Sequence, residues 1–125
     1  MHRPIVTPDL TPEYAPGTHV LLDLFDASHL DDVDALRRIL RDAATATGAT
    51  ILDDNFHRFD GRGGVTGVVL LKESHISIHT WPETGFAAVD IFLCGGLSPD
   101  PAVAQLKTDL APSRTTLTRV DRGDA

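Results

Sequence analysis

A stretch of twelve residues at positions 72–83, KESHISIHTWPE, concentrates the side chains that can do chemistry. It holds hydroxyls, imidazoles, carboxylates and the only tryptophan of a 125-residue chain. The apolar runs on either side, residues 67–71 and 86–94, have the composition of buried strands. Polar groups held between core elements need hydrogen-bond partners or a chemical task, so we expect the chemistry of the chain to be centred here.

A metal site is the first possibility. His75, His79 and Glu83 follow one another at intervals of four residues, a spacing that would place zinc ligands on one face of a helix. The residues between them are β-branched or aromatic, however, and Pro82 would break the last helical turn. The chain has one cysteine, so a second thiolate ligand is also missing. We therefore expect no metal.

A serine hydrolase is the second possibility, because Ser74 or Ser77 could pair with a histidine. The sequence lacks the Gly-x-Ser-x-Gly elbow, and 125 residues are few for such a fold. For Ser77 and His75 taken alone, ordinary strand residues with satisfied hydrogen bonds remain an open interpretation.

The same stretch resembles the self-processing bacterial and archaeal S-adenosylmethionine decarboxylase proenzymes. In that family Glu-Ser-His-(aliphatic)-Ser-Ile-His-Thr-Trp-Pro-Glu precedes an Ala-Ala-Val-Asp-Ile-Phe-x-Cys-Gly strand, and both halves are present here, as residues 73–83 and 87–95. The resemblance extends from about Thr18 to Gly123. Removing carbon dioxide next to an amine requires an electron sink, and the sequence shows no haem, flavin or nucleotide motif that could bring one.

The resemblance implies that the chain makes its own electron sink. Ser74 Oγ attacks the carbonyl of Glu73, the peptide rearranges to an ester, and elimination with hydrolysis leaves a pyruvoyl group at the start of residues 74–125. Residues 1–73 become the second chain. The pyruvoyl carbonyl then forms a Schiff base with the amine of the substrate.

The resemblance assigns two further residues to the processing reaction. His79 matches the histidine that removes the Ser74 α-proton, a task that suits a neutral imidazole near pH 7. Thr66 matches a position usually held by serine, and the threonine keeps the hydroxyl. Ser74 and His79 are five residues apart and would point to opposite faces of a flat strand, so we expect a bend or break near residues 74–75.

The resemblance also assigns residues to turnover and binding. Cys94 matches the proton donor of decarboxylation, and a thiol with an ordinary pKa of about 8.5 is mostly protonated at neutral pH. Phe59 and Trp81 match the aromatic residues around the adenine, and Glu83 matches the carboxylate that accepts from the ribose hydroxyls. A sulfonium nucleoside offers a flat base, a diol and a positive charge that aromatic faces attract.

Two alternatives to S-adenosylmethionine decarboxylation stay open. The processing motif indicates a pyruvoyl cofactor but does not indicate the substrate, so a self-processing enzyme of this kind could act on arginine or ornithine instead. The chain could also be an unprocessed paralogue that regulates a partner, although the intact Ser74, His79 and Cys94 argue against this.

The elements that position these residues follow from apolar periodicity. A glycine loop at residues 61–64 could cradle phosphate, but it joins strand to strand without opening a helix, so we expect a hairpin turn. Ser28 and Asp31 resemble a capped helix start, and Gly48 and Pro112 end the helices. The expected strands are residues 18–25, 49–59, 65–71, 86–94 and 115–120, and the expected helices run from about 29 to 47 and from about 98 to Pro112.

This order, with three consecutive strands between the helices, predicts an α+β fold: a two-layer α/β sandwich with an antiparallel or mixed sheet and two helices on one face. The family resemblance implies the same fold, with active sites built at the interface of a homodimer of cleaved protomers. We expect one domain over residues 18–125, preceded by an extended, proline-rich arm over residues 1–17.

Composition narrows the partners. The formal charge of −7 with scattered basic residues argues against nucleic acid and suits a cationic small molecule such as S-adenosylmethionine. No apolar run approaches the roughly 20 residues of a membrane span, and no signal segment follows the first residues, so we expect a cytoplasmic protein. Cys94 stands alone and has no partner for an internal disulfide.

Overall fold

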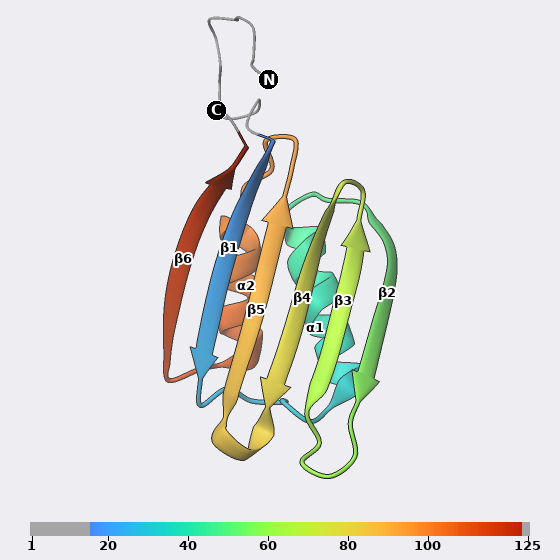
Figure 1. Cartoon of the computed structure of the whole chain (residues 1–125), viewed down its shortest axis with the longest axis vertical. Helices are drawn as coiled ribbons and strands as arrows, with labels where there is room; N and C mark the ends of the chain where they lie inside the picture. Colours follow the sequence, from blue (N-terminus) through green and yellow to red (C-terminus); the bar gives the residue numbers. More distant parts are fainter. Residues whose placement is uncertain (1–15, 124–125) are drawn as a thin grey trace, which may run out of the picture.

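The structure, a computed structural model, describes residues 16–123 as a six-stranded sheet covered on one face by two helices (Figure 1). The strand order is β2-β3-β4-β5-β1-β6, and every neighbouring pair is antiparallel. No helix among these residues is long and apolar enough to cross a membrane. The elements are β1 (Gly17–Phe25), α1 (Val33–Ala46), β2 (Ile51–Arg58), β3 (Val65–Leu71), β4 (Ser74–Trp81), the 3-10 turn η2 (Pro82–Thr84), β5 (Phe86–Leu93), α2 (Asp100–Leu110) and β6 (Arg114–Arg122).

The predicted two-layer α+β sandwich is confirmed, and the sheet is wholly antiparallel. The number of strands between the helices was wrong: there are four rather than three, because residues 74–81 form strand β4. Ile76, Ile78 and Thr80 alternate along β4 and are buried against the helices, which gives this polar segment one apolar side. The predicted arm over residues 1–17 lies outside the described residues except for its last two, and Gly17 already belongs to β1.

The core lies between the sheet and the two helices. Inward residues of the central strands pack against the apolar stripe of α1, where Leu36 and Leu40 are fully buried. Outward residues of the same strands form the open face of the sheet, the side opposite the helices. The open face carries the side chains of His79 and Trp81, so the fold presents the chemically important part of β4 to the surface.

Helix α1 begins later than the sequence predicted. Its N-cap is Asp32, whose carboxylate accepts from the backbone N–H of Ala35 at 3.0 Å, and not Ser28. An aspartate in an extended conformation directly before the helix satisfies a free N–H there, which Ser28 is too distant to reach. The end is as expected, since Gly48 follows the last turn with a φ of 86°.

The loop at residues 61–64 is a hairpin turn, as predicted. It joins β2 to β3, and the N–H of Phe59 donates to the carbonyl of Gly64 at 2.8 Å. Gly61 and Gly63 have φ values of 87° and 79°, a region that favours glycine.

Asp54 joins the edge strand β2 to helix α1. Its carboxylate accepts from Arg37 Nε at 3.1 Å and from Arg41 Nη1 at 2.6 Å. Burial alone would raise the pKa of Asp54, but the hydrogen bonds and charges of Arg41 and Arg37 outweigh it and lower the pKa below its ordinary value of 3.8. The charged carboxylate therefore stabilises the fold at neutral pH.

We expect Asp54→Asn to lower the free energy of unfolding by about 1 kcal/mol at pH 7, because charge-assisted bonds at a partly exposed site are worth about that much. The carboxylate contribution is present above the unfolded pKa and disappears as the pH falls through the lower folded pKa. In urea unfolding, the variant should therefore have a lower free energy of unfolding than the wild type at pH 7, and the two values should converge at acidic pH. Asp42→Asn, an exposed position on the same helix, is the control; an equal loss there would contradict the assignment.

Candidate active site

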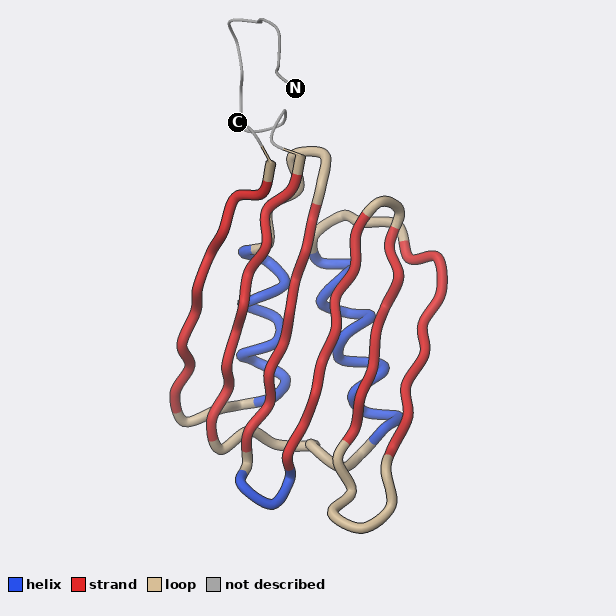
Figure 2. The backbone as a smooth tube through the Cα atoms, in the orientation of Figure 1, coloured by secondary structure: helices blue, strands red, loops and turns tan. Residues whose placement is uncertain are grey.

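The predicted site residues fall into two groups at opposite ends of β4. Ser74 begins the strand and His79 lies five residues along it, roughly 16 Å away at about 3.3 Å per residue. Glu73 and Cys94 lie at the Ser74 end. Figure 2 shows that the β3–β4 turn lies at one end of the sheet, while the β2–β3 loop and the turn η2 lie at the other.

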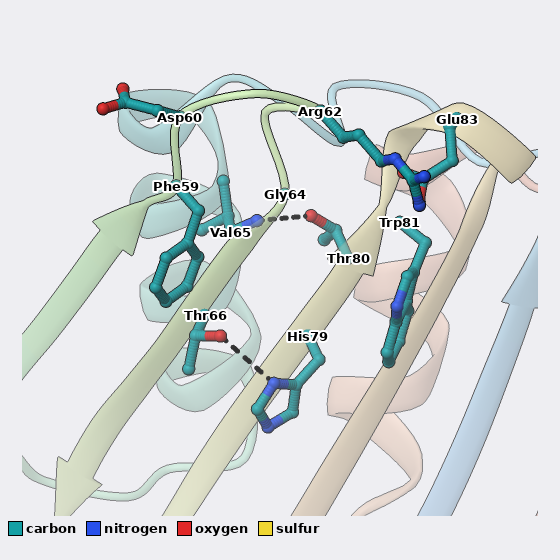
Figure 3. Close-up of a pocket in the computed structure, with 10 residues that line it drawn as sticks. All are labelled: Phe59, Asp60, Arg62, Gly64, Val65, Thr66, His79, Thr80, Trp81 and Glu83. Atoms are coloured by element: carbon teal, nitrogen blue, oxygen red, sulfur yellow. Dashed lines mark hydrogen bonds and ion pairs between the residues drawn. The ribbon is translucent and has the colours of Figure 1, made fainter.

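The His79 end contains a pocket of about 310 Å³ on the open face. Phe59 and Trp81 lie on opposite sides of it, with Thr66 and His79 between them (Figure 3). Its lining residues are Phe59, Asp60, Arg62, Gly64, Val65, Thr66, His79, Thr80, Trp81 and Glu83. Five of the residues predicted from the sequence therefore line one pocket. They are Phe59 directly after β2, Thr66 on β3, His79 and Trp81 on β4, and Glu83 in η2.

The floor of the pocket holds a hydroxyl–imidazole pair. Thr66 and His79 are direct partners across β3 and β4, and Thr66 Oγ1 lies 3.2 Å from His79 Nδ1 (Figure 3). Outward positions on neighbouring strands meet in this way because their side chains stand on the same side of the sheet. The Thr66 hydroxyl can donate to His79 Nδ1, which leaves the ring proton on Nε2, or accept from an Nδ1–H, which leaves Nε2 free to accept a proton.

The rim of the pocket holds an ion pair that the sequence did not reveal. Arg62 Nη1 in the glycine loop donates to Glu83 Oε2 at 3.4 Å. Arg62 is 80% exposed, so the pair contributes little stability and Glu83 remains available to a ligand. The pair brings the loop and η2 together across the mouth of the pocket.

A second hollow of about 290 Å³ continues the first along the open face and shares Phe59, Thr66 and His79 with it. It is also lined by Asn55, His57, Gly67, Val68 and Ser77. His57 was missed by the sequence analysis. His57 pairs with Thr66 across β2 and β3, so both side chains lie on the open face. This relation cannot be recognised until the pairing of the two strands is known.

At the other end of β4, Lys72 and Glu73 form a two-residue connection, because Leu71 and Ser74 are paired across the hairpin. Glu73 has a φ of 66°, a left-handed conformation that costs a residue with a side chain about 1 kcal/mol or more. Ser74 Oγ accepts a hydrogen bond from the backbone N–H of Cys94 at 3.1 Å. The Glu73–Ser74 peptide thus follows a strained residue and has a fixed hydroxyl beside it.

The bend predicted near residues 74–75 is absent. β4 pairs with β3 without a register shift from Ser74 to His79, and the irregular conformation belongs to Glu73 instead. Uninterrupted pairing keeps the alternation of side chains, so Ser74 and His79 are not brought together within one chain. The helical spacing required for a zinc site at His75, His79 and Glu83 is likewise not realised, because residues 74–81 form a strand.

The match to known proteins covers almost the whole described chain. A family model described as S-adenosylmethionine decarboxylase matches residues 18–123. The chain belongs to this family.

Individual relatives agree with the family match. The S-adenosylmethionine decarboxylase proenzyme of Thermomicrobium roseum is 41% identical over 108 residues, covering 86% of this chain and 93% of the relative. The proenzyme of that name from Synechococcus sp. WH7803 is 52% identical over 97 residues, covering 75% of each chain. The crystal structure of the adenosylmethionine decarboxylase from Aquifex aeolicus superimposes with a TM-score of 0.82 at 37% identity, covering 89% of this chain and 93% of that one. The family resemblance of residues 73–83 and 87–95 is therefore confirmed.

Proposed function

We propose that this chain is a decarboxylase of S-adenosylmethionine that cleaves itself between Glu73 and Ser74 and works with the resulting pyruvoyl group. Its product would be the decarboxylated aminopropyl donor for spermidine and other polyamines. The observation that carries the proposal is the convergence on one pocket of two aromatic rings, a carboxylate and a hydroxyl–imidazole pair, in a chain of this family.

The surroundings of Ser74 suit the formation of the group. Ser74 Oγ attacks the Glu73 carbonyl carbon, the bond from that carbon to the Ser74 nitrogen breaks, and an ester joins the two residues. The left-handed Glu73 supports this step, because strained backbone conformations of this kind are concentrated at reactive sites. Removal of the Ser74 α-proton then expels the Glu73 carboxylate, and hydrolysis releases ammonia. The pyruvoyl group supplies a carbonyl that withdraws electrons from the substrate carbon.

The separation of Ser74 from His79 supports a site shared between two protomers. Outside the pocket, the open face exposes large apolar side chains at Leu21, Leu70 and Val120. A sheet face with such residues is suited to pairing with a second copy of itself. A twofold axis running across the strands would bring the Ser74 end of one protomer over the His79 end of the other. We therefore propose a homodimer in which each site takes Ser74 and Cys94 from one chain and the pocket from its partner.

The pocket suits a nucleoside. Phe59 and Trp81 belong to the β2 and β4 sides of the pocket, and two strand spacings of about 4.8 Å leave roughly 10 Å between their strands, enough for a flat base with a ring on each side. The Glu83 carboxylate can accept from a ribose diol, and the aromatic faces attract a sulfonium. Ornithine has no flat group to place between the two rings, and arginine has a planar guanidinium but no diol for the Glu83 carboxylate.

Cys94 is proposed as the proton donor because its backbone N–H already holds Ser74 Oγ, which places the residue beside the reacting bond. The thiol is half-buried and free of any disulfide. A reducing compartment would keep it a thiol, in keeping with the cytoplasmic location expected from the sequence.

The intact mass of the purified protein tests the proposal. We expect two fragments, residues 1–73 ending at Glu73 and residues 74–125 without a free amino terminus. Carboxyl-labelled S-adenosylmethionine should release labelled carbon dioxide. An uncut chain would identify an unprocessed paralogue, and cut protein that releases carbon dioxide only from arginine or ornithine would identify a different substrate.

A further inference from the structure

A row of stacked side chains crosses the open face at its pocket end. Trp81 on β4 stacks on Phe86 of β5 with ring centroids 5.2 Å apart and an angle of 26° between the planes. Phe86 lies against Phe25 of β1 at 5.3 Å, and the Arg114 guanidinium of β6 covers the Phe25 ring at 3.7 Å. We call these four residues the aromatic row. Each neighbouring pair in it is a direct cross-strand pair.

We propose that Phe86 is a positioning residue that holds the Trp81 ring in the orientation needed to stack on the base of the substrate. The inference rests on the proposed function, in which Trp81 is one wall of the nucleoside pocket. Trp81 is the last residue of β4 and is 41% exposed, so the pocket side of its ring faces open space. Phe86 stacks on another part of the ring and restricts its rotation, and its centroid is nearer than that of the His79 ring, which lies 6.3 Å from Trp81.

The physical gain is preorganisation. A free tryptophan side chain must lose rotamer freedom when it stacks on a ligand, and this loss of entropy weakens binding. Phe86 imposes that loss before the ligand arrives. Phe25 and Arg114 extend the support, because Phe86 is itself held between two rings and the last ring is covered by a cation.

The opposite wall of the pocket is supported in the same way but in another geometry. His57 meets the Phe59 ring edge-on, with centroids 4.5 Å apart and an angle of 67° between the planes. Both aromatic walls are therefore backed by a second ring, whereas Arg62 and Glu83 at the rim form an ion pair in which the Arg62 side chain is 80% exposed. This contrast indicates that the pocket is built to keep the distance between Phe59 and Trp81 constant.

Phe86→Leu keeps an apolar side chain and removes the flat support. We expect KM for S-adenosylmethionine to rise roughly threefold to tenfold. Stacking of two aromatic rings contributes a factor of about this size to an equilibrium constant, in addition to the effect of burying apolar surface. Self-cleavage and kcat should stay close to wild type, since Phe86 touches neither Ser74 nor Cys94. Phe86→Tyr, which keeps the ring, should restore KM. Sedimentation should confirm that the variants keep the wild-type mass.

Trp81 is the only tryptophan, so its spectra report this contact directly. Phe86→Leu should weaken the near-ultraviolet circular dichroism of Trp81 and increase acrylamide quenching of its fluorescence, both without substrate. Phe56→Leu removes a ring from β2 that packs over Gly67 and under Arg37, so it should leave these two signals unchanged.

The wild-type enzyme is measured first, which separates this inference from the proposed function. Wild type that cleaves itself and shows a Trp81 fluorescence change with S-adenosylmethionine supports the function. Phe86→Leu with wild-type KM and wild-type Trp81 spectra would then overturn the role of Phe86 alone. If Phe86→Leu does not fold, Phe25→Leu takes its place, with a smaller rise in KM and the same spectral change expected; unchanged spectra there would overturn the inference as well.

Discussion

Co-expression of a Ser74→Ala chain with a His79→Ala chain will produce cleaved protein, although each variant alone will not complete the reaction. In the proposed homodimer, Ser74 of one chain acts with His79 of the other, and the two lie roughly 16 Å apart within a chain. A mixed dimer retains one site in which both residues are intact. Only the His79→Ala chain should be cut there, because it alone keeps Ser74.

Two affinity tags of different mass make the outcome measurable by mass spectrometry. Random pairing places about half of the His79→Ala chains in mixed dimers, so about half of them should be cleaved. Co-expression of Thr66→Val with His79→Ala is the control, because both changes affect the same pocket and no fully intact site can form. Purified mixed dimers in which neither chain is cut would contradict the shared site.

The His79→Ala chain expressed alone should stop at the ester. Formation of the ester needs the Ser74 hydroxyl, whereas the following elimination needs a base for the α-proton. Hydroxylamine should therefore cut this variant between residues 73 and 74 and leave Ser74→Ala intact. Normal processing of His79→Ala would remove His79 from the role of base.

Cys94→Ala will cut itself normally but turn over slowly and inactivate itself during turnover. Ser74 Oγ is held by the backbone N–H of Cys94, which the substitution keeps, so processing does not depend on the thiol. Loss of a proton donor costs roughly a hundredfold or more in rate. Without the thiol, the proton that should reach the substrate carbon can reach residue 74 instead.

The two protonation sites leave different products at residue 74. Protonation of the substrate carbon releases the amine and regenerates the pyruvoyl group. Protonation at residue 74 transfers the substrate nitrogen to the protein, releases an aldehyde and leaves alanine. Edman sequencing of the 74–125 fragment distinguishes a blocked end from alanine. Cys94→Ser, which keeps a weaker donor of similar size, should be intermediate, and undiminished turnover of Cys94→Ala would show that Cys94 only fills space.

Much of this architecture could be predicted because its causes are local. Alternating apolar residues mark the strands, a period of three to four marks the helices, and glycines with positive φ mark the turn at residues 61–64. The chemical identity of residues 73–83 also needs no structure, since the family resemblance depends on the order of side chains alone. The errors near α1 were local too: both Ser28 and Asp32 can cap a helix, and the sequence alone did not separate them.

The distribution of the site residues was decided by the tertiary structure. Which strand pairs with which, and in what register, depends on contacts between residues far apart in the chain. Those contacts place Thr66 beside His79 and Trp81 beside Phe86, and they leave Ser74 at the other end of the sheet. The sequence spacing of Ser74 and His79 suggested a bend, whereas continuous pairing with β3 keeps β4 regular. Side-chain alternation can be read along one strand, but the neighbours across the sheet exist only after the chain has folded.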